Sequence, residues 1–526
     1  MDIRRFLEKR VEKNLNKIFL YYRDAKISYN EFDNKINQVA NGFLKLGVKK
    51  GERICLMLPN IPEFLFSWFA LAKIGAVMVP ININFKINEA NYILSHSEAI
   101  GLVTTKDYLD IAFELKKKNK RVKWIMVVDE DIEKDGVISF NRIVDSMPKS
   151  LKGIDIKDDD LASIIYTSGT TGFPKGAMHV HRNLTMTGEA FLVRTQIGPD
   201  DKVMVILPLF HINAQFYSTM GAIAAEASLI LIKKFSASRF WEQAVRYQAT
   251  EFNFIGAIGR ILASRDIKEF RPEHKIRVAY GALITPDVYE VFTKRFHIPH
   301  VIDGYGLTEV PGVSQNPIGG VIKMRSIGLP AKHPDPNITF SEMKIVDDNG
   351  KELPSYEKGE LIVKSPVMMK GYFKDKGKTA EAIKDGWFYT GDYAYKDEDG
   401  YFFFVDRKKD IIRRKGENIS ATEVESIINA HPSVLETAVI AVPAELGEDE
   451  VMALIVLKDN ARLTPEDVID WCWDKLATFK IPRYIQFRKQ LPKTATERIA
   501  KYILKKEKDL LKNAFDMESY IKSKGR

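Results

Sequence analysis

The residues that point most directly to a chemistry are those from Tyr166 to Gly176, which read Tyr-Thr-Ser-Gly-Thr-Thr-Gly-Phe-Pro-Lys-Gly after an apolar run at 161–165. Glycines let the backbone adopt positive φ and approach a ligand closely, so that successive N–H groups can line an anion site. The hydroxyls add donors and Lys175 adds a compact positive charge. The segment therefore predicts a polyphosphate-binding loop. It is not a P-loop, in which the lysine precedes Ser or Thr, and its alternative is a solvated Gly/Thr turn.

A second group of polar residues, Asp303-Gly304-Tyr305-Gly306-Leu307-Thr308-Glu309, follows the strand-like pair Val301-Ile302. Ligand sites of α/β proteins gather at such strand ends. The tyrosine ring can stack on a purine, while Thr308 and Glu309 can reach a phosphate and a hard cation. Taken alone, a tyrosine flanked by glycines is also typical of turn packing.

A third motif, Trp387-Phe388-Tyr389-Thr390-Gly391-Asp392, precedes the charged segment that begins at Asp406-Arg407. A carboxylate such as that of Asp392 is well suited to accept both hydroxyls of a ribose. The alternative for Asp392 is an aspartate that caps a surface turn.

Together these motifs resemble those of the adenylate-forming superfamily of acyl-CoA synthetases, luciferases and peptide-synthetase adenylation domains, and the resemblance covers nearly the whole chain. It implies a two-step reaction. A carboxylate attacks the α-phosphate of ATP to give an acyl-adenylate and pyrophosphate, and a thiol then displaces AMP. The implied ligands are ATP, Mg²⁺, coenzyme A and a small-molecule carboxylic acid.

The resemblance also implies which residues carry each role. The phosphate loop comprises Thr167, Ser168, Gly169, Thr170, Thr171, Gly172 and Lys175. The nucleotide is further contacted by Gly281, Ala282, Asp303, Gly304, Tyr305 and Gly306, with Thr308 on the α-phosphate and Mg²⁺ held by Thr167 and Glu309. The ribose is assigned to Asp392 and Arg407, the hinge between domains to Lys409, and the thiol tunnel to Arg413, Lys415 and Gly416.

One departure from the family pattern concerns the lysine that usually serves adenylation. In the segment Pro492–Lys501, the register places Arg498 at that lysine position and Glu497 at the preceding glycine. Arginine keeps the charge and donates to phosphate, but its fork is wider than an ammonium group. We expect Arg498 to serve adenylation, with Lys501 as the second candidate.

The acyl pocket is indicated by Leu207–Gln215, which resembles the segment beside the acyl carboxylate. His211 is expected to line or gate this pocket, although a lone histidine is equally often a core residue. Asn213 and Gln215 add amide groups, which favour a polar or short acid over a long chain. Residues 67–76 and 235–241 are similar to bacterial carnitine/crotonobetaine–CoA ligases, and a medium-chain or aryl acid remains an alternative.

Two other functions remain as alternatives. An adenylation enzyme would load a carrier protein, but the chain has no carrier domain and no confidently placed aspartate for an α-amine. A catalytically weakened sensor would bind acyl ligands or nucleotide, but it would have little use for the remaining phosphate and ribose residues.

The composition agrees with a soluble cytoplasmic enzyme. The formal charge of +9 is modest for 526 residues and gives no sign of nucleic-acid binding. Two distant cysteines fit a reducing compartment. The most apolar region, residues 64–81, is interrupted by Lys73, Gly75 and Pro80 and predicts a buried helix followed by a strand rather than a membrane span. For the oligomeric state, the sequence leaves both a monomer and a homodimer as alternatives.

Alternating apolar runs and helical patterns predict an α/β fold with parallel sheets that positions these motifs. Buried strands are expected at 53–58, 203–207 and 227–232, and hairpin strands at 343–346 and 361–364. The resulting architecture is a large N-terminal domain of layered α/β sheets with a β-subdomain at 1–406, followed by a small mobile α+β C-terminal domain at 407–526.

Overall fold

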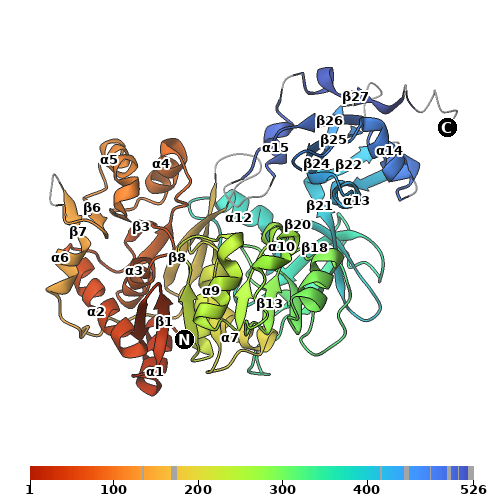
Figure 1. Cartoon of the computed structure of the whole chain (residues 1–526). Coiled ribbons are helices and arrows are strands. Elements are labelled where there is room, and N and C mark those ends of the chain that lie inside the picture. The colour runs from red at the N-terminus through yellow and green to blue at the C-terminus, as the bar shows by residue number, and fades with distance from the viewer. Residues whose placement is uncertain are drawn as a thin grey trace. The chain divides into compact units, whose positions relative to one another are not determined.

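The computed structural model describes residues 1–132, 136–167, 174–414, 417–443, 449–473, 475–494, 499–507, 509–518 and 520 (Figure 1). The described residues form two compact units. The first is made from the described residues of 1–167, 174–343 and 363–389, and the second from those of 344–362 and 390–526. The predicted domain boundary near residue 407 stays a prediction.

The first unit contains a seven-stranded sheet in the order β7-β6-β5-β3-β4-β8-β9. Its strands are β3 (Arg53–Met57), β4 (Val77–Pro80), β5 (Gly101–Thr104), β6 (Trp124–Val127), β7 (Val137–Ser139), β8 (Leu161–Thr167) and β9 (Lys175–Val180). All neighbours pair in parallel except β8 and β9, which form an antiparallel pair at the edge. The sheet therefore ends in the hairpin that carries the predicted phosphate loop.

Helices connect these parallel strands, as crossovers require. They are α3 (Pro62–Lys73), α4 (Ile87–His96), α5 (Leu109–Lys118) and α6 (Phe140–Asp145), and Figure 1 shows α4 and α5 side by side. Every residue of α3 except the half-buried Glu63 is buried, which confirms the buried helix predicted before β4. Among the described residues, no helix has the length and apolar character that a membrane crossing requires.

A second sheet of the first unit positions the other motifs. It runs β2 (Ala25–Ser28), β1 (Ile18–Tyr22), β11 (Ser228–Leu231), β10 (Lys202–Val205), β12 (Glu251–Asn253), β13 (Val278–Gly281), β14 (His300–Tyr305), β15 (Ser314–Gln315) and β16 (Ser326–Pro330). Within this sheet, the six neighbouring strands β1, β11, β10, β12, β13 and β14 pair in parallel. Their carboxyl ends therefore meet at one edge, where Asn253, Gly281 and Asp303 lie.

The remaining helices of the first unit pack around these sheets. They are α1 (Ile3–Lys13), α2 (Tyr29–Lys45), α7 (His181–Thr195), α8 (Met220–Ala224), α9 (Phe240–Tyr247), α10 (Gly256–Ser264), α11 (Pro286–Glu290) and α12 (Lys376–Ala382), with π-helical turns η2 (Asn213–Thr219) and η5 (Val291–Arg295). The fully buried Lys73 pairs with Asp33 at 2.6 Å and Glu8 at 3.3 Å, so its charge is compensated inside this packing.

Antiparallel strands and a small α+β body make up the rest. The strands β17 (Glu342–Val346), β18 (Gly359–Lys364), β20 (Trp387–Lys396) and β21 (Phe402–Arg407) neighbour one another in that order, with the short β19 (Ile383–Lys384) beside β20. The final body has β22 (Ile411–Arg414), β23 (Glu417–Ser420), β24 (Val434–Pro443), β25 (Asp449–Leu457), β26 (Tyr484–Arg488), β27 (Phe515–Asp516), α13 (Ala421–Asn429), α14 (Pro465–Trp473) and α15 (Lys501–Leu504). The expected α/β class with a smaller α+β body is confirmed.

Candidate functional site

The β8–β9 hairpin holds the two ends of the predicted phosphate loop next to each other. Thr167 and Lys175 are register partners, and the Thr167 hydroxyl donates to the Lys175 carbonyl at 3.4 Å. The loop residues between them, Ser168, Gly169, Thr170, Thr171 and Gly172, lie outside the described residues.

Tyr372 links Lys175 to Glu309. The Lys175 ammonium lies 4.4 Å from the centroid of the Tyr372 ring, and the Tyr372 hydroxyl donates to Glu309 Oε1 at 2.8 Å. Burial, followed by the charge of Glu309, raises the pKa of Tyr372, so this hydroxyl remains a donor. A cation and a carboxylate thus share one aromatic ring, which suits a site for phosphates and a hard metal ion. Tyr372 was not expected from the sequence, although its position directly after Gly371 was a signal for close backbone approach.

Main-chain hydrogen bonds fix the segment that carries Thr308 and Glu309. The Met369 N–H donates to the Glu309 carbonyl at 2.7 Å, and the imidazole Nε2 of His179 lies 2.8 Å from the Thr308 carbonyl oxygen. Neither His179 nor Met369 stood out in the sequence, because nothing local shows that these distant segments meet.

Asp303 stands at the end of β14, beside the end of β13. Its carboxylate oxygens accept hydrogen bonds from the N–H groups of Leu283 and Ile284, each at 3.0 Å, and Gly281 is its register partner. Desolvation raises the pKa of Asp303 to about 7, against the effect of these donors. The Asp303 carboxylate therefore holds the main chain of Leu283 and Ile284 in place, directly after Gly281 and Ala282.

Close packing explains the glycines of the second motif. A Cβ on Gly304 would lie 2.2 Å from the Tyr280 hydroxyl, and one on Gly306 would lie 2.3 Å from the Gly312 backbone nitrogen. Behind this segment the fully buried Arg194 donates to the Gly312 carbonyl. The half-buried Tyr305 thus extends from a tightly supported turn.

The expected acyl-pocket residues lie in the segment after β10, and Asn213 belongs to a polar cluster with Asn253 and Ser218. The Asn253 amide donates to Asn213 Oδ1 at 2.8 Å and to Ser218 Oγ at 3.0 Å. Gln215 is fully buried, and its amide nitrogen donates to the Leu209 carbonyl at 2.6 Å. The amide nitrogen of Gln215 is therefore used in a hydrogen bond to the main chain of the same segment. His211 is half-buried, and its ring contacts Phe210 edge to face at 4.6 Å.

In the second unit the two predicted ribose residues face each other. Asp392 and Arg407 are register partners in the antiparallel β20–β21 pair, and Arg407 Nε lies 3.6 Å from Asp392 Oδ1. The Asp392 side chain is buried, whereas Arg407 is half-exposed. The strand pair thus presents a carboxylate and a guanidinium together.

The other predicted residues of this unit are dispersed. Lys409 lies in the short turn Lys408–Asp410 between β21 and β22, and the exposed Arg413 donates its N–H to Asp449 at 3.3 Å. The Lys501 ammonium pairs with Glu425 at 2.8 Å, with both side chains largely buried. Burial opposes the charge of Lys501, but Glu425 and Asp406 raise its pKa overall. Lys415, Gly416 and Arg498 lie outside the described residues.

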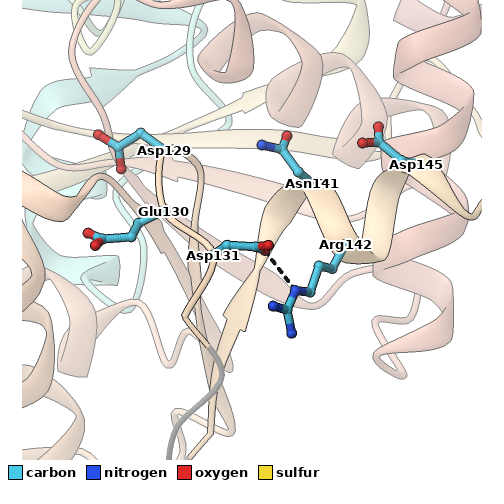
Figure 2. A pocket seen from close by; sticks show the side chains of 6 residues that line it. All are labelled: Asp129, Glu130, Asp131, Asn141, Arg142 and Asp145. Carbon is cyan, nitrogen blue, oxygen red and sulfur yellow. Dashed lines mark ion pairs between the residues drawn. The ribbon is translucent and has the colours of Figure 1, made fainter.

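A surface groove elsewhere on the first unit has the wrong charge for a nucleotide. Figure 2 shows its lining, which is Asp129, Glu130, Asp131, Asn141, Arg142 and Asp145. Arg142 is directed to Asp131 and pairs with it at 2.8 Å. None of the predicted site residues lines this groove. Among the described residues, no group of three or more His, Cys, Asp or Glu side chains could hold a metal ion by itself.

Two family models together match most of the chain. The model of the AMP-binding enzyme family matches residues 7–373, and that of the AMP-binding enzyme C-terminal domain matches residues 423–498. A crotonobetaine/carnitine–CoA ligase of Escherichia coli is 34% identical over 490 residues, which cover 91% of this chain and 93% of the relative.

Two solved structures show the same fold along nearly the whole chain. The anthranilate CoA ligase AuaEII in complex with anthranoyl-AMP has a TM-score of 0.89 at 28% identity and covers 96% of both chains. ATP-bound MatB from Rhodopseudomonas palustris has a TM-score of 0.86 at 27% identity, covering 96% of this chain and 98% of its own.

Proposed function

Since the chain belongs to the AMP-binding enzyme family and is an AMP-forming acyl-CoA synthetase, we propose that it activates a polar or short carboxylic acid, such as carnitine or crotonobetaine, and transfers the acyl group to coenzyme A. The observation that carries the site assignment is the arrangement of Lys175, Tyr372 and Glu309 at the loop end of the β8–β9 hairpin.

In the first step, the carboxylate of the acid attacks the ATP α-phosphate and pyrophosphate leaves. Lys175 and the N–H groups of the loop neutralise the leaving phosphates, and Thr308 donates to the α-phosphate. Mg²⁺ fits this site, because Glu309 and Thr167 offer hard oxygen ligands and phosphates supply the others. When bound, the ion supplies positive charge to the reacting phosphates.

In the second step, the coenzyme A thiol attacks the acyl carbon and AMP leaves. Asp392 and Arg407 hold the ribose through both steps. We assign the hinge to Lys409, with the C-terminal domain beginning at residue 407, and the thiol tunnel to Arg413, Lys415 and Gly416. A hinge at this position agrees with the short turn that joins β21 to β22.

We assign the adenylation cation to Arg498 rather than Lys501. The burial of Lys501 against Glu425 supports this choice, since the ammonium is already paired within its own unit. Pyrophosphate release should fall at least about tenfold in Arg498→Ala, the loss expected when a charge-assisted phosphate contact is removed. Lys501→Ala is the matched comparison, and a full rate in Arg498→Ala would remove this assignment.

The polar acid is supported by the amides of Asn213 and Asn253 and by the similarity to the crotonobetaine/carnitine–CoA ligase. The buried Asn253 Oδ1 has no hydrogen-bond partner among the described residues, and an apolar chain could not donate to it, so its burial would remain costly. A panel of carnitine, crotonobetaine, butyrate, octanoate, benzoate and anthranilate, scored by pyrophosphate release, tests the choice. Preference for octanoate would overturn it.

An aryl acid is the second candidate, favoured by the similarity to the solved anthranilate CoA ligase. Highest pyrophosphate release with benzoate or anthranilate in the same panel would establish it. Turnover with free coenzyme A, compared with loading of a separate carrier protein, tests the thiol acceptor.

A further inference from the structure

A buried histidine outside the assigned machinery connects the phosphate-loop hairpin to the Thr308–Glu309 segment. His179 lies in β9, which begins at Lys175, and its side chain is fully buried. Its Nε2 is 2.8 Å from the Thr308 carbonyl oxygen, and its Nδ1 is 3.2 Å from the Asn183 amide nitrogen. The ring also meets Phe216 edge to face at 5.1 Å.

The partners of His179 determine its tautomer. A carbonyl oxygen only accepts hydrogen bonds, so Nε2 carries the proton and donates to Thr308. The Asn183 amide nitrogen also donates to the Met368 carbonyl at 3.1 Å, which fixes the orientation of that amide. Nδ1 must therefore accept from Asn183, and the imidazole is neutral. Burial agrees with this state, because it lowers the pKa of His179 to about 4.

The same contacts tie together two segments that hold Glu309. His179 binds the carbonyl of Thr308, while Asn183 binds the carbonyl of Met368. The next residue, Met369, donates its N–H to the Glu309 carbonyl. The pair His179–Asn183 thus braces Thr308 and Glu309 from both sides against the strand that starts at Lys175.

We propose that His179 is a positioning residue for adenylation, which sets Thr308 and Glu309 against the strand that begins at Lys175 through its hydrogen bond to the Thr308 main chain. This inference rests on the proposed roles of Thr308 and Glu309. A misplacement of about 1 Å in a reacting constellation can cost two orders of magnitude in rate. Thioester formation from a preformed adenylate requires neither pyrophosphate departure nor the metal, so it should depend much less on this brace.

The test separates the two half-reactions in purified full-length His179→Leu and His179→Gln. Pyrophosphate release with crotonobetaine and ATP reports adenylation, and thioester formation from synthetic crotonobetainyl-adenylate and coenzyme A reports the second step. We expect His179→Leu to lower adenylation by about 10- to 100-fold and the second step by less than about twofold. His179→Gln, whose amide nitrogen can donate near the Nε2 position, should recover much of the loss.

His181→Leu is the matched control. His181 is also fully buried, and its Nδ1 accepts a hydrogen bond from the Ile3 N–H at 3.3 Å, so it braces the N-terminal helix and not Thr308. Its loss should change the two half-reactions by equal factors. Equal losses of both half-reactions in a folded His179→Leu or His179→Gln, or no loss at all, would overturn the proposal.

The proposed function fails in a different way. A wild-type enzyme that releases no pyrophosphate with any acid of the panel contradicts the function itself. If crotonobetaine alone is inactive, the best acid of the panel and its adenylate replace it, and the comparison between His179 and His181 variants remains decisive.

Discussion

At the scale of single residues, charge and protonation in the site are controlled by a few buried groups. Tyr372 orients the Glu309 carboxylate through one hydrogen bond while its ring lies under the Lys175 ammonium. The Tyr372 hydroxyl is the only part of this arrangement that a phenylalanine would remove. The hydrogen bond and the cation–π contact are therefore separable by mutation.

Tyr372→Phe should reduce adenylation by about 10- to 150-fold, since a hydrogen bond to a charged group contributes about 1.5–3 kcal/mol. The aromatic ring under Lys175 is retained, so Tyr372→Leu should lose more activity than Tyr372→Phe. Steady-state pyrophosphate release at varied ATP measures both. Equal activity of wild type and Tyr372→Phe would show that the hydrogen bond to Glu309 has no catalytic role.

Because His179 and His181 are buried as neutral imidazoles, the free energy of unfolding should fall at acid pH. Burial lowers the pKa of both His179 and His181 to about 4, whereas an unfolded histidine titrates near 6.5. The unfolded chain therefore binds protons first, and stability present above about pH 6.5 is lost as the pH falls toward 4. Urea midpoints at pH 7.5 and 5 should differ less for His179→Gln than for wild type. An unchanged difference between the two midpoints would contradict the neutral assignment.

At the scale of elements, the parallel strands could be predicted from the sequence, because apolar β-branched runs bounded by turn residues are local signals. The predicted strands at 53–58, 203–207 and 227–232 correspond to β3, β10 and β11. The contacts of Tyr372 and His179 could not be predicted. Tyr372 is 63 positions from Glu309 and His179 is 129 from Thr308, and no periodicity encodes such pairings.

The close packing around Gly306 predicts that a side chain at this position would disturb the segment that carries Thr308. In Gly306→Ala the new Cβ would lie 2.3 Å from the Gly312 backbone nitrogen, so the main chain must move. We expect a loss of about 1–3 kcal/mol in stability, as for overpacking, together with weaker adenylation. Gly198→Ala is the control, because no heavy atom lies within 4 Å of its added Cβ. Thermal unfolding and pyrophosphate release measure both effects, and wild-type values in Gly306→Ala would contradict the close packing.

At the scale of the whole molecule, we propose that the residues of the reaction are divided between the two compact units. The first unit holds Lys175, Thr308 and Glu309, whereas the second holds Asp392, Arg407 and Lys501. In the proposed reaction Asp392 and Arg407 stay on the ribose through both steps, so the residues that change between the steps follow them in the chain and need a connection that allows movement. Lys409, in the turn after β21, is our candidate for that connection.

Lys409→Pro tests whether a hinge at this turn serves the second step. Proline fixes φ near −65° and removes a rotation that domain movement requires. If adenylation uses the conformation that this φ permits, pyrophosphate release should stay within about threefold of wild type, while thioester formation from a preformed adenylate falls by tenfold or more. Lys409→Ala controls for the lost charge and should retain both half-reactions. A proline variant that forms thioester at the wild-type rate would place the hinge elsewhere in the chain.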